Sequence, residues 1–339
     1  MLYKHIIKPF FFLFDPEKVH GFVSLFIKFS FKIPGVAPLV RYYAGSNGKN
    51  EGFDLLNLHF KNRVGLAAGF DKNAELIDEL SSFGFGFIEV GAVTPEPQSG
   101  NPKPRLFRLP HDKALVNRMG FNNKGVDYLI GKLKKRKSDI VVGVNLGKNT
   151  HTPNSKAADD YLLLFEKLFD FADYFVINVS CPNISDLREL QDKEALEKIL
   201  LEIEKINNAK PNPKPVLLKV SPDLNDNQLD EVINLVKTTG IAGVVAVNTT
   251  VSRNGLKTSK TLVNAIGKGG LSGAPLKKRA LEVVRYLKEK SEKKFPVIGV
   301  GGIFTADDAN EMFAAGADLI QVFTGFVYEG PFIAKKLLK

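Results

Sequence analysis

The chain has 339 residues, of which 44% are hydrophobic and 25% charged, the proportions of a folded globular protein. Its single cysteine excludes an intramolecular disulfide and argues against a secreted, disulfide-stapled fold. The net charge of +10 suits nucleic acid, an anionic membrane or an anionic substrate, but the sequence has no nucleic-acid motif, no zinc spacing and no short-period repeat.

The first 45 residues differ from the rest, because they are rich in phenylalanine and carry an excess of positive charge. Asp15 followed by Pro16 is typical of a helix start, with the aspartate as N-cap. The apolar residues that follow keep the i, i+3, i+4, i+7 spacing of an amphipathic helix: Val19, Phe22, Val23 and Phe26. We expect two short helices joined near Asp15, and expect Pro34 and Pro38 to end the segment.

No apolar run in this segment approaches the ~20 residues that span a bilayer. A cleaved signal peptide is disfavoured, because the short apolar core contains Lys8 and Pro9 and lacks a small-residue cleavage site. Two interpretations remain open: a basic, aromatic hairpin that lies on a membrane surface, or two helices packed on the main domain with their phenylalanines as core. We predict an N-terminal helical segment over residues 1–45 and a second domain over residues 46–339.

From about residue 63 onward, continuous apolar runs alternate with helix-like stretches. The predicted strands are 64–67, 87–91, 140–145, 174–179, 216–220, 243–248, 297–301 and 319–323. The predicted helices are 74–83, 124–135, 157–170, 193–207, 227–239, 275–290, 305–315 and 331–338. Strands that stay apolar along their length are typical of parallel sheets buried on both faces. Eight such units predict an α/β fold, a (β/α)8 TIM barrel. A doubly wound sheet fits less well, because no G-x-G-x-x-G follows the first strand.

In such a barrel the active site lies at the carboxyl ends of the strands. The unusual polar and glycine residues of this chain fall at those ends: Gly69, Asp71, Lys72, Asn117, Asn145, Asn178, Lys219, Asn248, Gly302 and Thr324. A purely structural role could easily explain any one of these residues. It does not easily explain a set that covers the ends of all eight strands, which favours a functional site there.

The ends of the fifth, seventh and eighth strands suggest a phosphate-bearing cofactor. Loops after strands 7 and 8 of a barrel often bind phosphate through backbone N–H groups, and Gly301, Gly302 and Gly325 allow that close approach. Ordinary tight turns are the alternative. Lys219 is expected in the barrel mouth, where a buried ammonium needs an anion such as a reduced flavin.

The most informative stretch is 178–183, Asn-Val-Ser-Cys-Pro-Asn, which follows a predicted buried strand. Paired carboxamides such as Asn178 and Asn183 fix a planar, amide-rich ligand by donor and acceptor geometry. The thiol of Cys181 beside them is a candidate proton acceptor or nucleophile. A small buried cysteine in a turn is the structural alternative.

Taken together, these residues resemble the dihydroorotate dehydrogenases of the quinone-dependent, membrane-associated class, over nearly the whole chain. The matching stretches are 65–72, 93–95, 101–108, 117–121, 178–183, 248–250, 269–273 and 299–302. The helix that starts at Asp15-Pro16-Glu17 and contains His20 distinguishes this class from the soluble ones.

The resemblance implies one FMN per chain across the barrel mouth. The implied FMN contacts are Ala68, Gly69, Phe70, Asp71, Lys72, Asn145, Asn178, Lys219, Gly273, Gly302, Phe323 and Thr324. The implied contacts of dihydroorotate and orotate are Lys72, Asn117, Arg118, Met119, Gly120, Phe121, Asn178, Asn183, Asn248 and Thr249. His20 and Arg108 match positions that line a quinone tunnel, and no metal site is implied.

The implied reaction is the oxidation of (S)-dihydroorotate to orotate in de novo pyrimidine (UMP) biosynthesis, with a membrane quinone as final electron acceptor. A base removes the C5 proton while a hydride leaves C6 for FMN. We expect a peripheral membrane protein on the cytoplasmic face of a bacterial plasma membrane, because no organelle-targeting segment precedes Met1.

Some positions depart from the pattern of the class. Cys181 stands where the quinone class carries serine as the base, and Ile184 stands where a threonine usually helps relay the proton. We expect these two changes to belong together, because a thiol, with a pKa of about 8.5, needs less help to deprotonate than a hydroxyl. Ala92 and Val247 replace hydroxyl residues near FMN, and we assign them no contact.

Two alternatives remain. Cys181 favours a soluble-type dihydroorotate dehydrogenase that uses fumarate or NAD, whereas the N-terminal hairpin and the run 187–191 argue against it. The second alternative is a barrel that binds a nucleotide or phosphate ligand without redox chemistry, since barrels host many functions.

Overall fold

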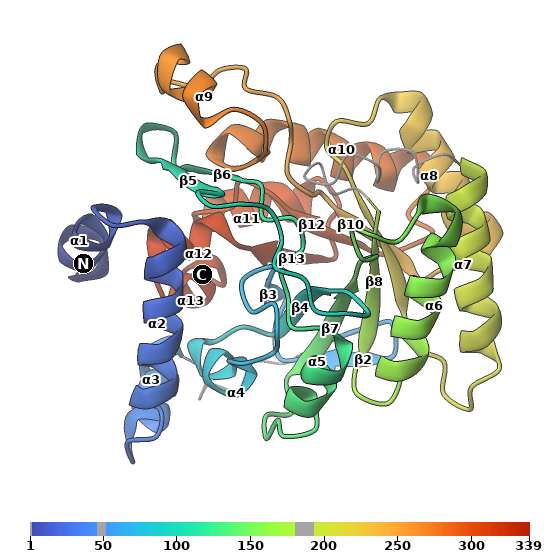
Figure 1. Cartoon of the computed structure of the whole chain (residues 1–339), viewed down its shortest axis with the longest axis horizontal. Helices are drawn as coiled ribbons and strands as arrows, with labels where there is room; N and C mark the ends of the chain where they lie inside the picture. Colours follow the sequence, from blue (N-terminus) through green and yellow to red (C-terminus); the bar gives the residue numbers. More distant parts are fainter. Residues whose placement is uncertain (1, 46–51, 180–192) are drawn as a thin grey trace.

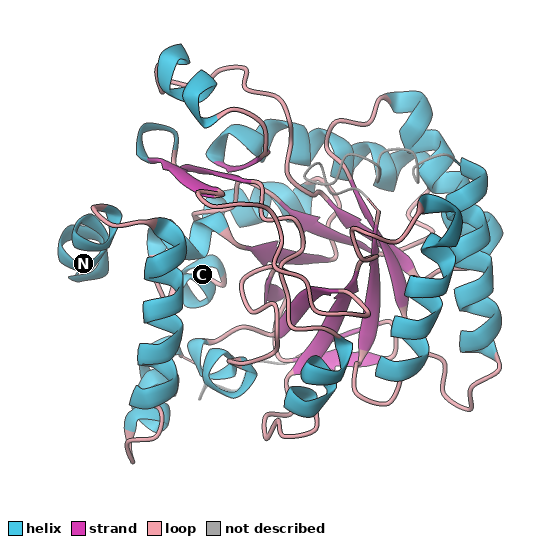
Figure 2. Ribbon diagram, in the orientation of Figure 1, coloured by secondary structure: helices cyan, strands magenta, loops and turns pink. Residues whose placement is uncertain are grey.

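Eight parallel strands close into a barrel, with helices around the outside (Figures 1 and 2). The structure, a computed structural model, describes residues 2–45, 52–179 and 193–339. The barrel strands, in the order in which they pair, are β10 (Gly243–Ala246), β12 (Val297–Val300), β13 (Leu319–Val322), β3 (Val64–Leu66), β4 (Phe87–Val93), β7 (Val141–Leu146), β8 (Tyr174–Asn178) and β9 (Val216–Val220). The predicted TIM barrel is therefore confirmed.

Each predicted helix is present, although the ends differ by a few residues. They are α4 (Ile77–Leu80) with η2 (Ser81–Phe83), α5 (Val126–Leu133), α6 (Ala157–Leu168), α7 (Lys193–Asn208), α8 (Asp226–Thr239), α10 (Lys277–Lys290), α11 (Ala306–Ala314) and α13 (Ile333–Leu337). The first is much shorter than predicted, because Ala74 has a left-handed φ of 55° and interrupts the helical backbone. Capping boxes at Asn225 and Thr305 fix the starts of α8 and α11.

The sequence patterns did not predict several short elements. The hairpin β1 (Phe53–Leu55) and β2 (Leu58–Phe60) packs its apolar side chains against the amino-terminal end of the barrel interior. An antiparallel sheet forms from β5 (Leu106–Leu109), β6 (Ala114–Asn117) and β11 (Gly270–Gly273). Other short elements in the described parts of the chain are η3 (Pro110–Asp112), η4 (Asn154–Lys156), η6 (Ala274–Leu276), α9 (Lys260–Ile266) and α12 (Thr324–Glu329).

The N-terminal segment forms more helix than the sequence predicts. It contains η1 (Tyr3–Ile7), α1 (Lys8–Phe12), α2 (Pro16–Ser30) and α3 (Val36–Ala44). Asp15 caps α2 as expected, with its Oδ1 accepting from the backbone N–H of Lys18 at 2.8 Å. The prediction that Pro34 and Pro38 end the segment is wrong. Pro38 lies in the first turn of α3, where its missing N–H costs no helical hydrogen bond.

One face of these helices packs on the barrel and the other is exposed. Ile27, Phe31 and Val40 contact the main core, and the Tyr3 hydroxyl donates to the carbonyl of Val327 at 2.6 Å. Thirteen of the eighteen large hydrophobic side chains exposed in the described parts of the chain nevertheless belong to residues 2–45. The helices therefore dock on the main domain without using most of their phenylalanines as core.

Glycine at position 143 is required by a buried tyrosine ring. A Cβ there would lie 2.0 Å from Cζ of Tyr174, whereas a Cβ at Gly131, inside α5, meets nothing within 4 Å. Gly143→Ala should therefore lower the free energy of unfolding by about 1–3 kcal/mol. The matched control Gly131→Ala should leave it unchanged or raise it by up to about 1 kcal/mol. Chemical denaturation measures both, and equal stability of the two variants would contradict this packing account.

Glu75 joins α2 to the barrel helices. Its carboxylate accepts from Lys28 and Lys124 at 2.7 Å each and from the hydroxyl of Tyr128 at 2.5 Å. Burial acts to raise the pKa of Glu75, but these three hydrogen bonds outweigh burial and lower the pKa to about 2. Because the folded pKa lies below the ordinary value of 4.5, this stabilisation is present above about pH 4.5 and disappears as the pH falls toward 2.

Glu75→Gln should thus cost about 1–2 kcal/mol of unfolding free energy at pH 7 and progressively less below pH 4.5. Denaturation at pH 7 and at pH 3 gives the comparison. Asp127→Asn, which removes an exposed ion pair with Lys167, is the control and should cost little at either pH. A loss from Glu75→Gln that is the same at both pH values would show that the three hydrogen bonds do not hold the carboxylate ionised.

Candidate active site

A polar layer lies inside the barrel toward the carboxyl ends of its strands. Side chains alternate along a strand, so an apolar residue that faces the interior is followed two positions later by another inward residue. In β4 this pair is Phe87 and Glu89, and in β9 it is Leu217 and Lys219. Glu89 accepts from Nε2 of Gln321 at 2.7 Å, and its other oxygen lies 3.6 Å from Nζ of Lys219.

A row of carboxamides leads from this layer to the barrel mouth. Asn145 donates its Nδ2 to Glu89 at 2.8 Å, and Asn178 donates its Nδ2 to Oδ1 of Asn145 at 2.9 Å. Asn248 donates its Nδ2 to Oδ1 of Asn178 at 3.3 Å and accepts from the backbone N–H of Thr249 at 2.9 Å. Four residues predicted as FMN or substrate contacts are therefore connected directly.

The loop after β3 contributes both structural and candidate binding groups. Gly69, which follows Ala68, has a φ of 95°. Its backbone N–H donates to the carbonyl of Gly91 at 2.7 Å. The Asp71 carboxylate accepts from the backbone N–H groups of Glu75 and Leu76, and burial raises its pKa to about 6. The Asp71 side chain therefore holds the turn that leads into α4.

Lys72 extends from the same loop toward the long loop after β4. Its Nζ donates to Oδ1 of Asn122 at 2.5 Å. Asn122 was not among the predicted site residues, although it lies directly after the matching stretch 117–121. A lysine ammonium has three N–H donors, so this hydrogen bond does not prevent Lys72 from also binding a carboxylate ligand.

The stretch 117–121 is fixed by its backbone. Asn101 donates two hydrogen bonds to it, from its backbone N–H to the carbonyl of Met119 and from its Nδ2 to the carbonyl of Arg118. Gln98 donates to the carbonyls of Gly120 and Phe121 at 3.1 and 3.2 Å. Asn117 donates to the carbonyl of Gly270 at 3.4 Å.

Arg118 is held by carbonyls outside the barrel mouth. Its guanidinium donates to the carbonyls of Ile266 and Lys268, at 3.1 Å for the latter, and lies 4.6 Å from the ring centre of Phe107. The side chain therefore fastens the loop before β11, and a contact of residue 118 with the substrate stays a prediction.

Glycines and a hydroxyl gather where β11, β12 and β13 end. A Cβ at Gly302 would lie 2.5 Å from Cα of Lys277, the first residue of α10, and a Cβ at Gly273 would lie 2.3 Å from the carbonyl oxygen of Lys113. The Oγ1 of Thr324 lies 2.8 Å from Oγ of Ser272. Close backbone packing at a helix start suits a phosphate group.

Phe323 packs against Phe70 with ring centres 5.9 Å apart, which brings the ends of β3 and β13 together. His20 of α2 makes an edge contact with the same Phe70 at 4.9 Å. Burial, and then the nearby charge of Lys72, lowers the pKa of His20. The imidazole is therefore kept neutral next to the predicted flavin site.

Arg108 lies between the antiparallel sheet of β5, β6 and β11 and the N-terminal helices. Its Nη1 donates to the carbonyl of Phe14 at 2.7 Å, and the guanidinium lies 4.6 Å from the ring centre of Phe12. Burial lowers its pKa. Its Nε is buried without a hydrogen-bond partner among the described residues, which suits an acceptor such as a quinone carbonyl.

Other sequence predictions stand differently. Cys181, Asn183 and Ile184 lie outside the described residues, so their roles stay predictions.

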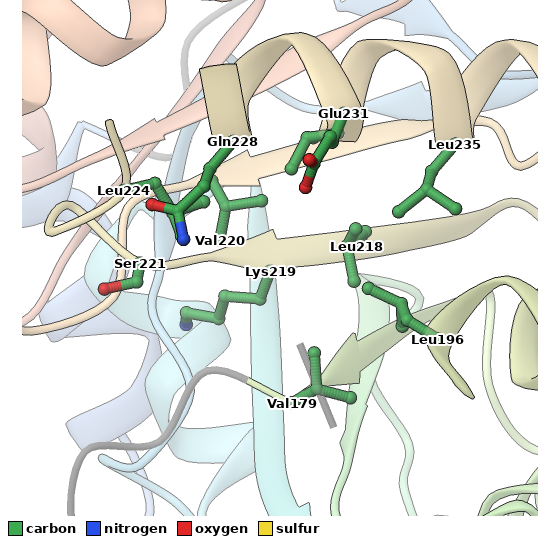
Figure 3. Close-up of a pocket in the computed structure, with 11 residues that line it drawn as sticks. Val179, Leu196, Leu218, Lys219, Val220, Ser221, Leu224, Gln228, Glu231 and Leu235 are labelled. Atoms are coloured by element: carbon green, nitrogen blue, oxygen red, sulfur yellow. The ribbon is translucent and has the colours of Figure 1, made fainter. Parts of the chain in front are cut away.

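The sequence analysis did not identify Glu89 and Gln321 as site residues, although a carboxylate in a continuous apolar strand is itself a signal of a functional position. A cavity of ≈ 40 Å³ lies next to β9 (Figure 3). Its lining includes Gln228, Glu231 and Leu235 of α8 and Lys219 of β9.

The residues of the mouth fit an FMN cofactor. The amide row provides donors and acceptors for a planar ring system, and Lys219, the register partner of Asn178 on the neighbouring strand, provides a cation. The glycine-lined end beside Thr324 provides a place for a phosphate. No cluster of three metal-ligating side chains occurs within the described ranges.

Comparisons with known proteins identify the family of the chain. The family model described as dihydroorotate dehydrogenase matches residues 53–339. A dihydroorotate dehydrogenase (quinone) of Christiangramia forsetii is 53% identical over 99% of this chain and 97% of the relative, and one of Roseiflexus is 45% identical over 98% and 91%. Crystal structures of the Eimeria tenella enzyme are similar, with a TM-score of 0.80. The form with ferulenol is 33% identical over 89% of this chain and 88% of that chain, and the ligand-free form 35% identical over 90% and 93%. The chain therefore belongs to the dihydroorotate dehydrogenase family.

Proposed function

We propose that the protein oxidises dihydroorotate to orotate in pyrimidine biosynthesis, with FMN as cofactor and a quinone as final electron acceptor. The observation that carries the proposal is the connected row Asn145, Asn178 and Asn248 at the barrel mouth of a chain from this family. Relatives similar over nearly their full length are named as the quinone enzyme, which disfavours the alternative acceptors fumarate and NAD.

FMN is the cofactor of this family, and we assign one per chain. When bound, it takes the hydride of the substrate and passes the electrons to the quinone. The amides of Asn145 and Asn178 and the ammonium of Lys219 would hold its ring system. The groups proposed around the rest of the cofactor are Ala68, Gly69, Phe70, Asp71, Lys72, Gly273, Gly302, Phe323 and Thr324.

The substrate would lie between Lys72 and the amide row. The ammonium of Lys72 can pair with the carboxylate of the substrate, and carboxamides can read the donors and acceptors of its ring. Asn117 and the backbone of 118–121, which Asn101 and Gln98 hold in place, would form the adjacent wall. Cys181 is the proposed base that takes the proton from C5.

The quinone would reach the site past His20 and Arg108. Both line the junction of the N-terminal helices with the barrel, and the neutral imidazole and unpartnered Nε suit an uncharged acceptor. The exposed phenylalanines beside this junction support peripheral membrane association. Among the helices of the described parts, none has the length and apolar character to cross a membrane.

Two related assignments remain proposals. The N-terminal unit would comprise residues 1–45 and the catalytic unit residues 46–339, and the family match that begins at residue 53 supports this division. The cytoplasmic face of a bacterial plasma membrane remains the expected location.

Removal of the thiol tests the base. Cys181→Ala should slow the reduction of bound flavin by dihydroorotate by about 10²–10⁴-fold, because general-base catalysis contributes that much, while FMN stays bound. Anaerobic stopped-flow absorbance gives the rate. Cys181→Ser, the control, should retain turnover with its pH dependence moved upward, since a hydroxyl is the weaker acid. Reduction of the alanine variant at the native rate would remove Cys181 from the mechanism.

The exposed aromatic face can be tested separately. Phe22, Phe26 and Phe29 are 59–62% exposed, and changing all three to Gln should weaken binding to anionic lipid vesicles by at least about tenfold. Leu163, Leu201 and Leu262, exposed elsewhere on the barrel, provide the control when changed to Gln. Vesicle sedimentation measures both variants. Equal retention of binding by the two triple variants would contradict a docking role for the N-terminal helices.

A further inference from the structure

Glu89 is a buried carboxylate that the proposed reaction does not use. It lies within β4, its side chain has no exposed surface, and the apolar layer that includes Phe87 lies on its amino-terminal side. Its oxygens accept from Asn145 at 2.8 Å and from Gln321 at 2.7 Å, with Lys219 at 3.6 Å. An isolated charge at this depth is costly, and these three partners, from three other strands, offset that cost.

An ionised carboxylate only accepts hydrogen bonds, and this property fixes the amide that faces it. Asn145 must turn its NH2 group toward Glu89, so its oxygen faces Asn178. Asn178 must then turn its own NH2 group toward Asn145, and its oxygen receives Asn248. The direction of the whole row therefore follows from the charge at its inner end.

The outer end agrees with this direction. The oxygen of Asn248 accepts from the backbone N–H of Thr249 at 2.9 Å, a group that can only donate. A donor-only group at one end and an acceptor-only group at the other leave one consistent orientation for the three amides between them. Replacing the inner acceptor with an amide, which both donates and accepts, would remove one of the two constraints.

We propose that Glu89 is a positioning residue for the substrate site. It sets which atoms of Asn178 and Asn248 act as donors and which as acceptors, and hence how the mouth reads a planar ring with alternating N–H and C=O groups. This inference rests on the proposed function. It assigns Glu89 no contact with the substrate, because Asn145 and Asn178 lie between them in the row.

The test compares orotate binding to FMN-loaded native protein and Glu89→Gln, followed by the change in flavin absorbance. In excess FMN, which offsets any loss of cofactor affinity through Asn145 and Asn178, the variant should bind orotate roughly tenfold or more weakly, because misdirected amides lose at least one hydrogen bond. Glu204→Gln is the control. Glu204 is also buried, but it lies in α7, outside the barrel, and accepts a hydrogen bond from Asn207 of the same helix. It should bind orotate as the native protein does.

A charge swap gives a more specific test. In the double variant Glu89→Gln with Asn145→Asp, the new carboxylate at position 145 accepts from both sides, so Asn178 recovers its direction. In excess FMN, orotate affinity should return to within about threefold of native, well above that of Glu89→Gln alone. If Glu89→Gln does not fold, the swap decides alone, and a larger loss overturns the proposal.

The outcomes separate this inference from the function on which it rests. A native protein that holds FMN but binds no orotate would contradict the proposed function. A native protein that binds orotate, together with a Glu89→Gln variant of equal affinity, would leave the function intact and overturn the positioning role of Glu89.

Discussion

The alternation of side chains along eight parallel strands is the constraint on which the rest of the molecule depends. In a closed barrel every second residue of each strand faces the interior, so the register of the strands decides which side chains meet. The register places Asn178 of β8 beside Lys219 of β9. Aromatic and aliphatic residues occupy the inward positions at the amino ends, and polar ones occupy the positions toward the carboxyl ends. The proposed chemistry at the mouth is a consequence of this gradient.

The N-terminal helices are tied to the same mouth. Arg105, which is buried, donates to both carboxylate oxygens of Glu17 in α2 at 2.8 and 3.1 Å. It also donates to the carbonyl of Asn101, the residue that holds the backbone at 118 and 119. A bidentate pair of this kind fixes geometry as well as adding energy. The element proposed to receive the quinone is thus connected through one arginine to the loop proposed to hold the substrate.

The sequence predicts the periodic parts of the fold well and the non-periodic parts poorly. The eight strands and their helices follow from long apolar patterns, whereas the sheet of β5, β6 and β11 depends on pairing between residues such as Val116 and Leu271, which are far apart in the chain. The row Asn145, Asn178 and Asn248 was predicted as a set, because all three lie at strand ends. The carbonyl partners of the Arg118 side chain could not be predicted, since a cation can take any nearby carbonyl and no local pattern records which one.

The central claim is that this barrel oxidises dihydroorotate and passes the electrons to a quinone. Its most direct test is steady-state oxidation of dihydroorotate by the purified protein in detergent, with a soluble quinone analogue or fumarate as the acceptor. The account predicts turnover with the quinone analogue and none with fumarate. Turnover with fumarate alone would show that the N-terminal helices do not select the acceptor. A flavin-loaded protein that oxidises dihydroorotate with neither acceptor would contradict the account.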